Sequence, residues 1–334
     1  MLKRLLGLIT LALFFSVITA VLLHKDYKTY LDTPLTIESP AVFTVEAGMS
    51  FSDVNRQLSQ LGLNRNAEYL EILARYSGKA NKIKTGEYLL PVGLKPEELL
   101  DVFVAGKEIQ YSFTLLEGWH IREMLEAIHA TDLLIHTLTD VSEDTLMQEL
   151  GYTETVAEGL FFPDTYSFPK NTTDKAFLQR AYQQLQHVLA EEWQTRAENL
   201  PYQTPYEALV MASIIEKETG LASERGTIAG VFVRRLNKNM KLQTDPTVIY
   251  AMGKQYDGNI RKKDLEIDSP HNTYRYKGLP PTPIALVGRE AIHAALHPEE
   301  GKSLYFVAKG DGSHYFSENL TEHNRAVAKY QLKK

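Results

Sequence analysis

The ten residues from Met211 to Gly220 read MASIIEKETG, an apolar run followed by two glutamates that lie two positions apart. A helix is predicted over residues 206–219. At 100° per residue from Met211, Glu218 falls at about 340°, between Ile214 and Ile215 in the most apolar stripe. Glu216 falls at about 140°, close to the opposite side. The two carboxylates therefore cannot act as a pair, and Glu218 is the unusual one.

A charge on an apolar helix face costs free energy unless it is paired or protonated. Burial raises the pKa of a carboxyl, and a carboxyl with a raised pKa suits general acid catalysis. Glycosidases keep one carboxylic acid protonated near neutral pH in this way. The alternative is that Glu218 reaches solvent in the last helical turn, just before Gly220. The helical pattern leaves both interpretations open.

Composition places the chain among ordinary globular proteins of more than one domain. It has 334 residues, 44% hydrophobic and 23% charged, with a net charge of −6. This charge disfavours nucleic acid as a partner. The chain contains no cysteine, which excludes disulfides and thiolate metal sites.

The N-terminus predicts a membrane anchor over residues 1–24. Leu5 to Leu23 contains no charged residue, and as a helix it spans the roughly 30 Å hydrocarbon layer of a bilayer. A cleaved signal peptide would need small residues before its cleavage site, but Ile18 occupies the −3 position relative to Ala20. Lys3 and Arg4 predict a cytoplasmic N-terminus, with everything after residue 24 outside.

Beyond the anchor the pattern predicts an α+β protein. A polar, extended connector is expected from Asp26 to Pro40. Residues 25–108 then form a small α/β module, in which strands at 42–46 and 85–90 enclose helices that begin near Asp53 and Ala67. A third helix follows at 96–104.

Residues 109–334 are predicted to form a larger mixed α+β domain with its core at 201–334. Residues 130–200 are expected to be largely helical, with a break at GLFFPDTYSFP, residues 159–169. That segment is either an exposed aromatic platform or a loop packed into the core.

Two stretches of the small module, TVEAGMSFSDVNRQL (44–58) and KTGEYLLPVG (84–93), resemble the LysM carbohydrate-binding module. LysM modules bind the N-acetylglucosamine of peptidoglycan or chitin. The spacing between the two strands is longer than in a compact LysM. A small α/β spacer without sugar-binding activity is therefore the alternative.

Four stretches of the larger domain resemble the MltG (YceG-like) family: ALVMASIIEKETG, GVFVRRLNKNMKLQTDPTVIYAMG, SPHNTYRYKGLPPTPI and LYFVAKGDGSHYFSENLTEHNRA. These proteins are endolytic murein transglycosylases of the bacterial inner membrane. The resemblance implies cleavage of the β-1,4 bond between N-acetylmuramic acid and N-acetylglucosamine, with a 1,6-anhydro end and without a cofactor. It maps the catalytic glutamate onto Glu218, places the catalytic domain in the periplasm, and implies peptidoglycan as substrate and peptidoglycan synthases as partners.

Polar side chains of the same domain are candidates for holding the sugar. Amides and hydroxyls hydrogen-bond N-acetyl groups and tyrosine rings stack on sugars, which selects Gln243, Asp245, Thr247, Tyr250, Asn272 and Tyr274. Asx-turns and helix capping are the alternative roles of Asp245 and Asn272. Arg234 and Arg235 fit either the carboxylates of muramyl peptides or a solvated helix end.

A metal site is not expected. His293 and His297 are four residues apart on a predicted helix, but no HExxH motif and no third acidic ligand accompany them in the sequence. Two other functions compete with the transglycosylase: a non-catalytic, LysM-type wall-binding protein, and a hydrolytic muramidase with Asp245 as its second carboxylate.

Overall fold

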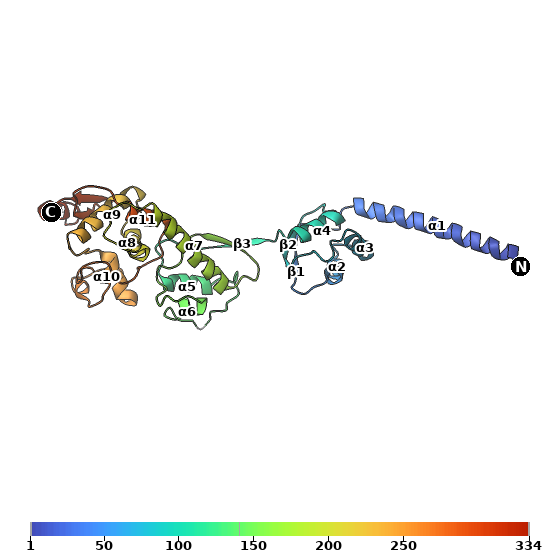
Figure 1. Cartoon of the computed structure of the whole chain (residues 1–334), viewed down its shortest axis with the longest axis horizontal. Coiled ribbons are helices and arrows are strands. Elements are labelled where there is room, and N and C mark those ends of the chain that lie inside the picture. The colour runs from blue at the N-terminus through green and yellow to red at the C-terminus, as the bar shows by residue number, and fades with distance from the viewer. Residues whose placement is uncertain (1, 140, 333–334) are drawn as a thin grey trace. The chain divides into compact units, whose positions relative to one another are not determined.

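The computed structural model describes residues 2–139 and 141–332 of the chain and confirms a mixed α+β protein (Figure 1). It divides into two compact units. The first comprises Met1–Tyr111 with Ser167–Lys170, and the second comprises Ser112–Tyr166 with Asn171–Lys334. Each sheet has two strands.

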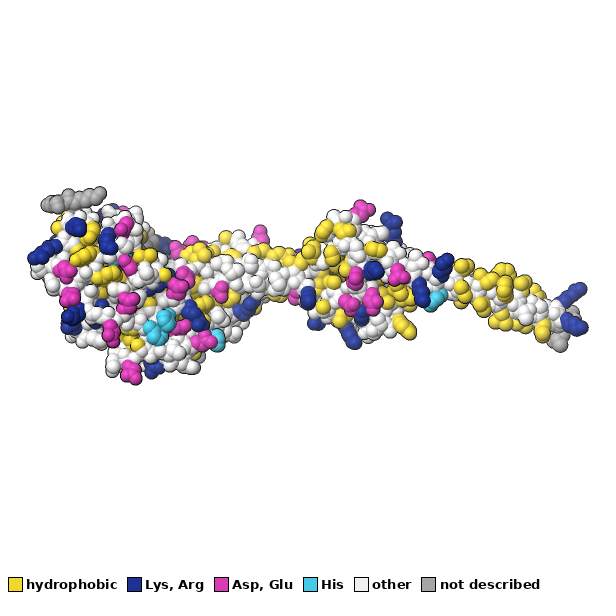
Figure 2. All heavy atoms as spheres, turned by 90° about the horizontal axis from the view of Figure 1, so that it is seen from above, with side chains coloured by type: hydrophobic (Ala, Val, Ile, Leu, Met, Phe, Trp, Pro, Cys, Tyr) yellow, Lys and Arg dark blue, Asp and Glu magenta, His cyan; other side chains and the backbone are white. Residues whose placement is uncertain are grey.

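The first unit begins with one long helix, α1 (Leu2–Asp32). Among the described residues, α1 is the helix long and apolar enough to cross a membrane. Figure 2 shows hydrophobic side chains covering it, with Lys and Arg near its free end. The prediction of an extended connector from Asp26 was wrong, because the helix continues to Asp32. Its last turns are held by tertiary packing, with the ring of Tyr30 buried and in contact with that of Tyr69.

The rest of the first unit follows the predicted order of elements. They are β1 (Ala41–Val45), α2 (Phe51–Gln60), α3 (Ala67–Tyr76), β2 (Gly86–Leu90) and α4 (Pro96–Ala105). Strands β1 and β2 are antiparallel, so that Phe43 and Tyr88 are directly opposite each other. Both rings are buried against Phe103 of α4. Ser50 caps α2 through a capping box with Asp53.

The first half of the second unit contains more irregular structure than predicted. Its elements are β3 (Gln110–Thr114), α5 (Ile121–His129), α6 (Leu146–Leu150), β4 (Thr165–Pro169) and α7 (Asp174–Gln194). Strands β3 and β4 pair with each other, and each has some residues assigned to the first unit. The expectation that residues 130–200 are largely helical holds for α7 and little else. The aromatic segment at 159–169 is packed into the core, with Phe161 and Phe168 fully buried. Glycine at position 159 lets the start of this segment pack closely against Pro283, because a Cβ at residue 159 would lie only 2.4 Å from the Cβ of Pro283.

The second half of this unit is arranged around α8. Its elements are α8 (Pro205–Glu218), α9 (Ala222–Asn237), α10 (Asp245–Met252), the 3₁₀ turns η1 (Gly253–Gln255) and η2 (Asp264–Glu266), α11 (Arg289–Leu296), β5 (Tyr305–Ala308), β6 (His314–Ser317) and α12 (Leu320–Tyr330). Thr204 and Glu207 form a capping box at the start of α8. All residues from 208 to 215 are buried, and α7, α9, α10 and α11 pack around the helix. Helix α8 therefore runs through the core and ends, at Glu218, near the edge of the unit.

Candidate active site

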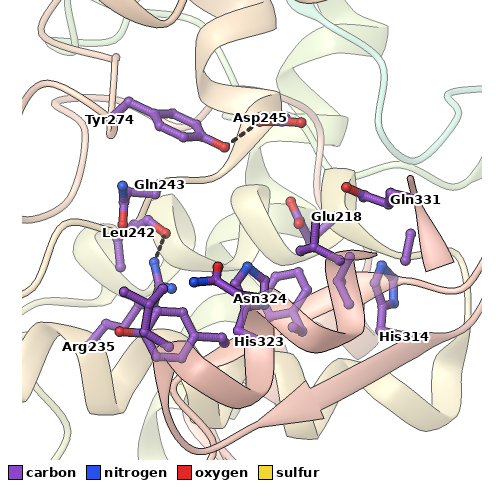
Figure 3. Close-up of a pocket in the computed structure, with 16 residues that line it drawn as sticks. Glu218, Arg235, Leu242, Gln243, Asp245, Tyr274, His314, His323, Asn324 and Gln331 are labelled. Carbon is purple, nitrogen blue, oxygen red and sulfur yellow. Dashed lines mark hydrogen bonds between the residues drawn. The ribbon is translucent and has the colours of Figure 1, made fainter. Parts of the chain in front are cut away.

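Glu218 is the last residue of α8 and lines a pocket of about 460 Å³. The walls come from α8, α9, the segment leading into α10, the β5–β6 hairpin and α12. Figure 3 shows Glu218 between Tyr274 and Asp245 on one side and His323 and Asn324 on the other. The side chain is thus partly buried and faces an opening large enough for a ligand.

The surroundings of Glu218 favour its protonated form. Burial raises the pKa of this carboxyl to about 7, and the negative charge of Asp245 acts in the same direction. A hydrogen bond from Thr244 Oγ1 to Glu218 Oε2, 2.7 Å long, and the charge of Arg235 oppose the rise. Near neutral pH the carboxyl therefore exists in both forms, as required of a group that first donates and then accepts a proton.

Glu216 lies in different surroundings from Glu218, as the helical phase predicts. Its Oε2 accepts a 3.1 Å hydrogen bond from the backbone N–H of Gly288, the residue that caps α11. Arg225 Nη2 lies 3.9 Å from its other oxygen, and only 6% of the Glu216 side chain is exposed. Burial raises the pKa of this carboxyl too. Glu216 is therefore a buried link between α8 and α11 and has no place in the pocket of Glu218.

Three of the six predicted sugar-binding residues line the same pocket as Glu218: Gln243, Asp245 and Tyr274. Tyr274 Oη donates a 2.6 Å hydrogen bond to Asp245 Oδ1. Gln243 has a positive φ of 50°, a conformation that costs a residue with a side chain free energy. This backbone lets its N–H reach the carbonyl of Thr273 at 3.2 Å.

Thr247 and Asn272 are fully buried behind the pocket wall and do not line it. Thr247 Oγ1 donates a 2.7 Å hydrogen bond to the carbonyl of Thr244. The Asn272 amide donates to the carbonyls of Leu265 and Ile267 at 3.0 and 2.8 Å. The Thr247 bond holds the backbone of Thr244, whose hydroxyl reaches Glu218, and the Asn272 bonds hold the segment at 265–267.

Tyr250 lies in a second cavity, away from Glu218, where it interacts with Glu158. Its ring centroid is 4.8 Å from that of His271 and 5.6 Å from that of His120. Glu158 accepts a 3.1 Å hydrogen bond from the Ile121 N–H, and burial raises its pKa to about 7. Glu158 could not be singled out from the sequence, because it precedes an irregular segment and has no helical phase.

The C-terminal hairpin and α12 contribute pocket residues that the sequence analysis missed. They are Tyr305, Phe306, Val307, Ala308, His314, Leu320, His323, Asn324, Val327 and Gln331. The ring of Tyr305 stacks on that of His323, with centroids 5.2 Å apart. His314 Nδ1 lies 2.7 Å from Glu224 Oε2 of α9. The sequence predicts the hairpin through its Gly-Asp-Gly turn, but not its position against α9.

A solvated helix end, one of the two roles expected for Arg234 and Arg235, is wrong for Arg235. Its side chain is buried, and Nε donates a 2.6 Å hydrogen bond to the carbonyl of Leu304. Nη1 donates to the carbonyls of Lys241 and Leu242 at 3.2 and 2.8 Å. Arg235 therefore ties the pocket walls together beside Glu218.

The sequence shows no acidic metal ligand for His293 and His297, but in the structure Glu192 of α7 lies beside both. One ligand atom from each residue lies within 4.8 Å of the others. Glu192 already has two partners, His293 Nδ1 at 2.9 Å and Arg289 Nη1 at 3.2 Å. His297 Nε2 contacts the Thr195 carbonyl at 2.7 Å. These contacts give each member of the cluster a partner within the protein.

Fold and site together define a class: an α+β protein with an N-terminal apolar helix and one partly buried carboxyl in an open, polar and aromatic pocket. Comparison with known proteins narrows this class. A sequence model of the YceG-like family matches residues 43–329, and the chain belongs to this family.

Relatives named endolytic murein transglycosylase cover most of the chain. The protein from Bacillus subtilis (strain 168) is 32% identical over 327 residues, which cover 92% of this chain and 86% of that protein. One from Streptococcus pneumoniae serotype 2 (strain D39) is 28% identical and covers 92% of this chain and 62% of the relative. A crystal structure of a putative YceG-like protein from Listeria monocytogenes matches with a TM-score of 0.55 and 29% identity, covering 86% of this chain and 99% of that one. These comparisons confirm the resemblance seen in the sequence.

Proposed function

We propose that this chain is an endolytic murein transglycosylase in which Glu218 is both the acid and the base. The observation that carries the proposal is Glu218 at the end of α8, in an open pocket, with a pKa raised to about 7. The family and its named relatives supply the reaction class, a lyase acting on peptidoglycan glycan strands. The site supplies the group that this reaction needs.

The proposed reaction needs one carboxyl and no water. Protonated Glu218 donates its proton to the glycosidic oxygen while the bond from this oxygen to C1 of N-acetylmuramic acid breaks. The resulting carboxylate removes the proton from the C6 hydroxyl of the same sugar. O6 then forms the new bond to C1 and leaves a 1,6-anhydro end, with Glu218 protonated again. Because the nucleophile belongs to the substrate, its attack gains from proximity.

The alternative is a hydrolytic muramidase, in which a second carboxylate acts with water. Asp245 is the candidate because it lines the pocket of Glu218. Its Oδ1, however, accepts the hydrogen bond of Tyr274. We assign Asp245 an electrostatic role, in which its charge keeps Glu218 protonated.

Some of the candidate binding residues line the pocket of Glu218, and the others lie outside it. We propose that Gln243 and Tyr274 contact the glycan directly, because their side chains line the pocket beside Glu218. Asn324 and His323 of α12 extend this set on the opposite wall. Thr247, Asn272 and Tyr250 are proposed to act indirectly, by holding the loop and α10 that form the near wall.

A location in the cell is also part of the proposal. We propose that residues 1–24 anchor the chain in the bacterial inner membrane, N-terminus inside, and that residues 109–334 catalyse in the periplasm. Residues 25–108 are proposed to be a LysM-like module, in keeping with the order β1, α2, α3, β2. Peptidoglycan synthases are the proposed protein partners, since they supply nascent strands.

The products of digestion test this function. Purified full-length protein in detergent is incubated with peptidoglycan in H₂¹⁸O, and the fragments are weighed. Unlabelled 1,6-anhydro ends support the transglycosylase. Reducing ends carrying ¹⁸O would show a muramidase, and intact glycan would show a non-catalytic wall-binding protein.

Replacing Asp245 with Asn separates its two possible roles. If Asp245 acts through its charge, the variant should lose no more than about tenfold in activity, and the pH dependence should move to lower pH because the pKa of Glu218 falls. A loss of about 10³-fold or more, with an unchanged pH dependence, would instead mark Asp245 as a second catalytic carboxylate. Initial rates of fragment release between pH 5 and 8.5 measure both quantities.

The pH dependence of the wild-type enzyme follows from the first proton transfer. Only the protonated form of Glu218 can start the reaction, so kcat/KM should be level at acidic pH and fall about tenfold per pH unit above the pKa. Burial places that pKa at about 7. Rates measured in buffers of constant ionic strength give the midpoint. A midpoint near 4.5, the ordinary value for Glu, would contradict the assignment.

A further inference from the structure

Helix α3 carries a stripe of apolar and aromatic side chains, two of which are exposed, while the third, Tyr69, is partly buried against the core of the first unit. Ile72 is 52% exposed and Tyr76 is 92% exposed. With Tyr69 they are spaced i, i+3 and i+7, and thus share one helix face. Leu70, Leu73 and Ala74 point into the core of the unit, so the stripe is distinct from the face that stabilises the fold.

This stripe begins where α1 joins the module. The ring of Tyr69 lies 5.5 Å from that of Tyr27 and 5.6 Å from that of Tyr30, centroid to centroid. Tyr69 Oη also donates a 2.8 Å hydrogen bond to Asp26 Oδ2. Figure 1 shows α3 on the side of the module that α1 enters, with β1 and β2 on the other. No flexible linker separates α1 from these contacts, because the helix is continuous from Leu2 to Asp32.

Helix geometry gives the depth of the contact in a bilayer. If the uncharged run Leu5–Leu23 fills the hydrocarbon layer, Tyr27 lies four residues, or about 6 Å, beyond its edge. The headgroup region on each side of a bilayer is roughly 5–8 Å thick. Tyr27 and its neighbour Tyr69 are therefore at the level of the headgroups, where tyrosine is enriched in membrane proteins.

Charges of both signs lie near this position, and an acidic one, Asp26, is bonded to Tyr69. Lys25 and Lys28 are exposed on the outer end of α1, where basic side chains meet anionic headgroups favourably. Glu71 and Arg75, which form an ion pair, lie beside the stripe on α3, and the helical phase puts Glu68 about 40° from Ile72. The module thus presents apolar, aromatic and charged side chains side by side.

We propose that Tyr69, Ile72 and Tyr76 of α3 rest on the outer lipid surface of the membrane where α1 leaves it. This inference depends on the proposed membrane anchor, but not on the transglycosylase activity. The first unit would then be held against the bilayer by two contacts, the helix that spans it and the stripe that lies on it.

Because the chain contains no cysteine, single labels can test the depth of each position. Ile72→Cys and Leu89→Cys variants of the full-length protein are labelled with the fluorophore NBD. They are reconstituted in vesicles of phosphatidylethanolamine and phosphatidylglycerol, with and without lipid-attached spin-label quenchers. Leu89 is the matched control, since it is 55% exposed and lies on β2. A Val17→Cys variant, in the apolar part of α1, reports insertion.

The label at position 72 should be quenched several-fold more strongly than that at position 89, with emission shifted to the blue. Equal, weak quenching at 72 and 89, together with strong quenching at 17, would overturn the proposal and leave the anchor intact. Weak quenching at 17 would overturn the anchor itself, and the proposal with it. Vesicles without other proteins ensure that a protein partner cannot protect the stripe.

Discussion

Replacing Glu218 with Gln should lower the rate of anhydro-end formation by about 10³–10⁴-fold, the upper part of the range for a group that transfers protons in catalysis. Gln has nearly the shape of Glu and accepts the hydrogen bond of Thr244 Oγ1 equally well. It can neither protonate the glycosidic oxygen nor take the proton of the C6 hydroxyl. Release of anhydro-muropeptides, quantified by mass spectrometry, gives the rate.

Glu216→Gln is the matched control, two residues away on the same helix. This variant should keep activity within about tenfold of wild type, because Glu216 binds the Gly288 N–H and lies outside the pocket. If Glu216→Gln is as inactive as Glu218→Gln, the assignment of Glu218 fails. Loss of activity in both variants with intact folding would point to the coupling of α8 and α11 as the essential feature.

Folding of the Glu218→Gln variant can be checked through the pH dependence of stability. The folded protein keeps the Glu218 proton up to a pKa of about 7, whereas the unfolded chain loses it near the ordinary value of 4.5. The folded state thus binds more protons between these values, and stability falls as pH rises through this window. Gln does not titrate, so the Glu218→Gln variant lacks this fall in stability and should be at least as stable as wild type at pH 8. Its two tryptophans, Trp119 and Trp193, lie in the second unit and report its unfolding by fluorescence.

Part of the signal that singles out Glu218 in the sequence is local. A helix of period 3.6 sets the phase of each side chain and separates Glu218 from Glu216. Residues 208–215, however, are buried on every side of the helix, so phase alone does not give Glu218 a role, and the resemblance to the YceG-like family was needed for that. Phase also did not reveal that Glu216 is buried too, because its partner Gly288 is 72 residues away.

The pocket itself could be predicted only in part. Gln243, Asp245 and Tyr274 come from polar, proline-bounded loops that the sequence singles out, and they do line it. Asn272 belongs to these loops and Thr247 to the first turn of α10, but both are buried, and a loop pattern has no period that tells a buried side chain from one that lines the pocket. The wall formed by α12 depends on docking between distant segments, and no local rule predicts this. The helical continuation of α1 past Asp26 likewise depends on packing, since Tyr30 is buried with Leu35 and Ile37 in the core of the unit.

Loss of Arg235 should lower the stability of the second unit. Its guanidinium bonds the carbonyls of Leu304, Lys241 and Leu242 and lies 4.9 Å from the centre of the Tyr305 ring. Arg235→Leu leaves these carbonyls without a donor, and we expect it to lower the free energy of unfolding by about 3–5 kcal/mol. Chemical denaturation followed by tryptophan fluorescence measures the loss. Arg235→Lys, which keeps the charge without the planar fork, should fall between Leu and wild type.

The same substitution should change the pH dependence of catalysis, which a purely structural role would not do. The charge of Arg235 lowers the pKa of Glu218, so in Arg235→Leu the descending limb of kcat/KM should move to higher pH, while Arg235→Lys should keep it near the wild-type position. The neighbouring Arg234 is the control: it bonds the carbonyls of Ser303 and Glu299 and does not line the pocket. Arg234→Leu should cost less stability and leave the limb in place. An equal shift in both Leu variants would show that Arg235 acts on Glu218 only through the fold, and the electrostatic link between α9 and the end of α8 would have to be abandoned.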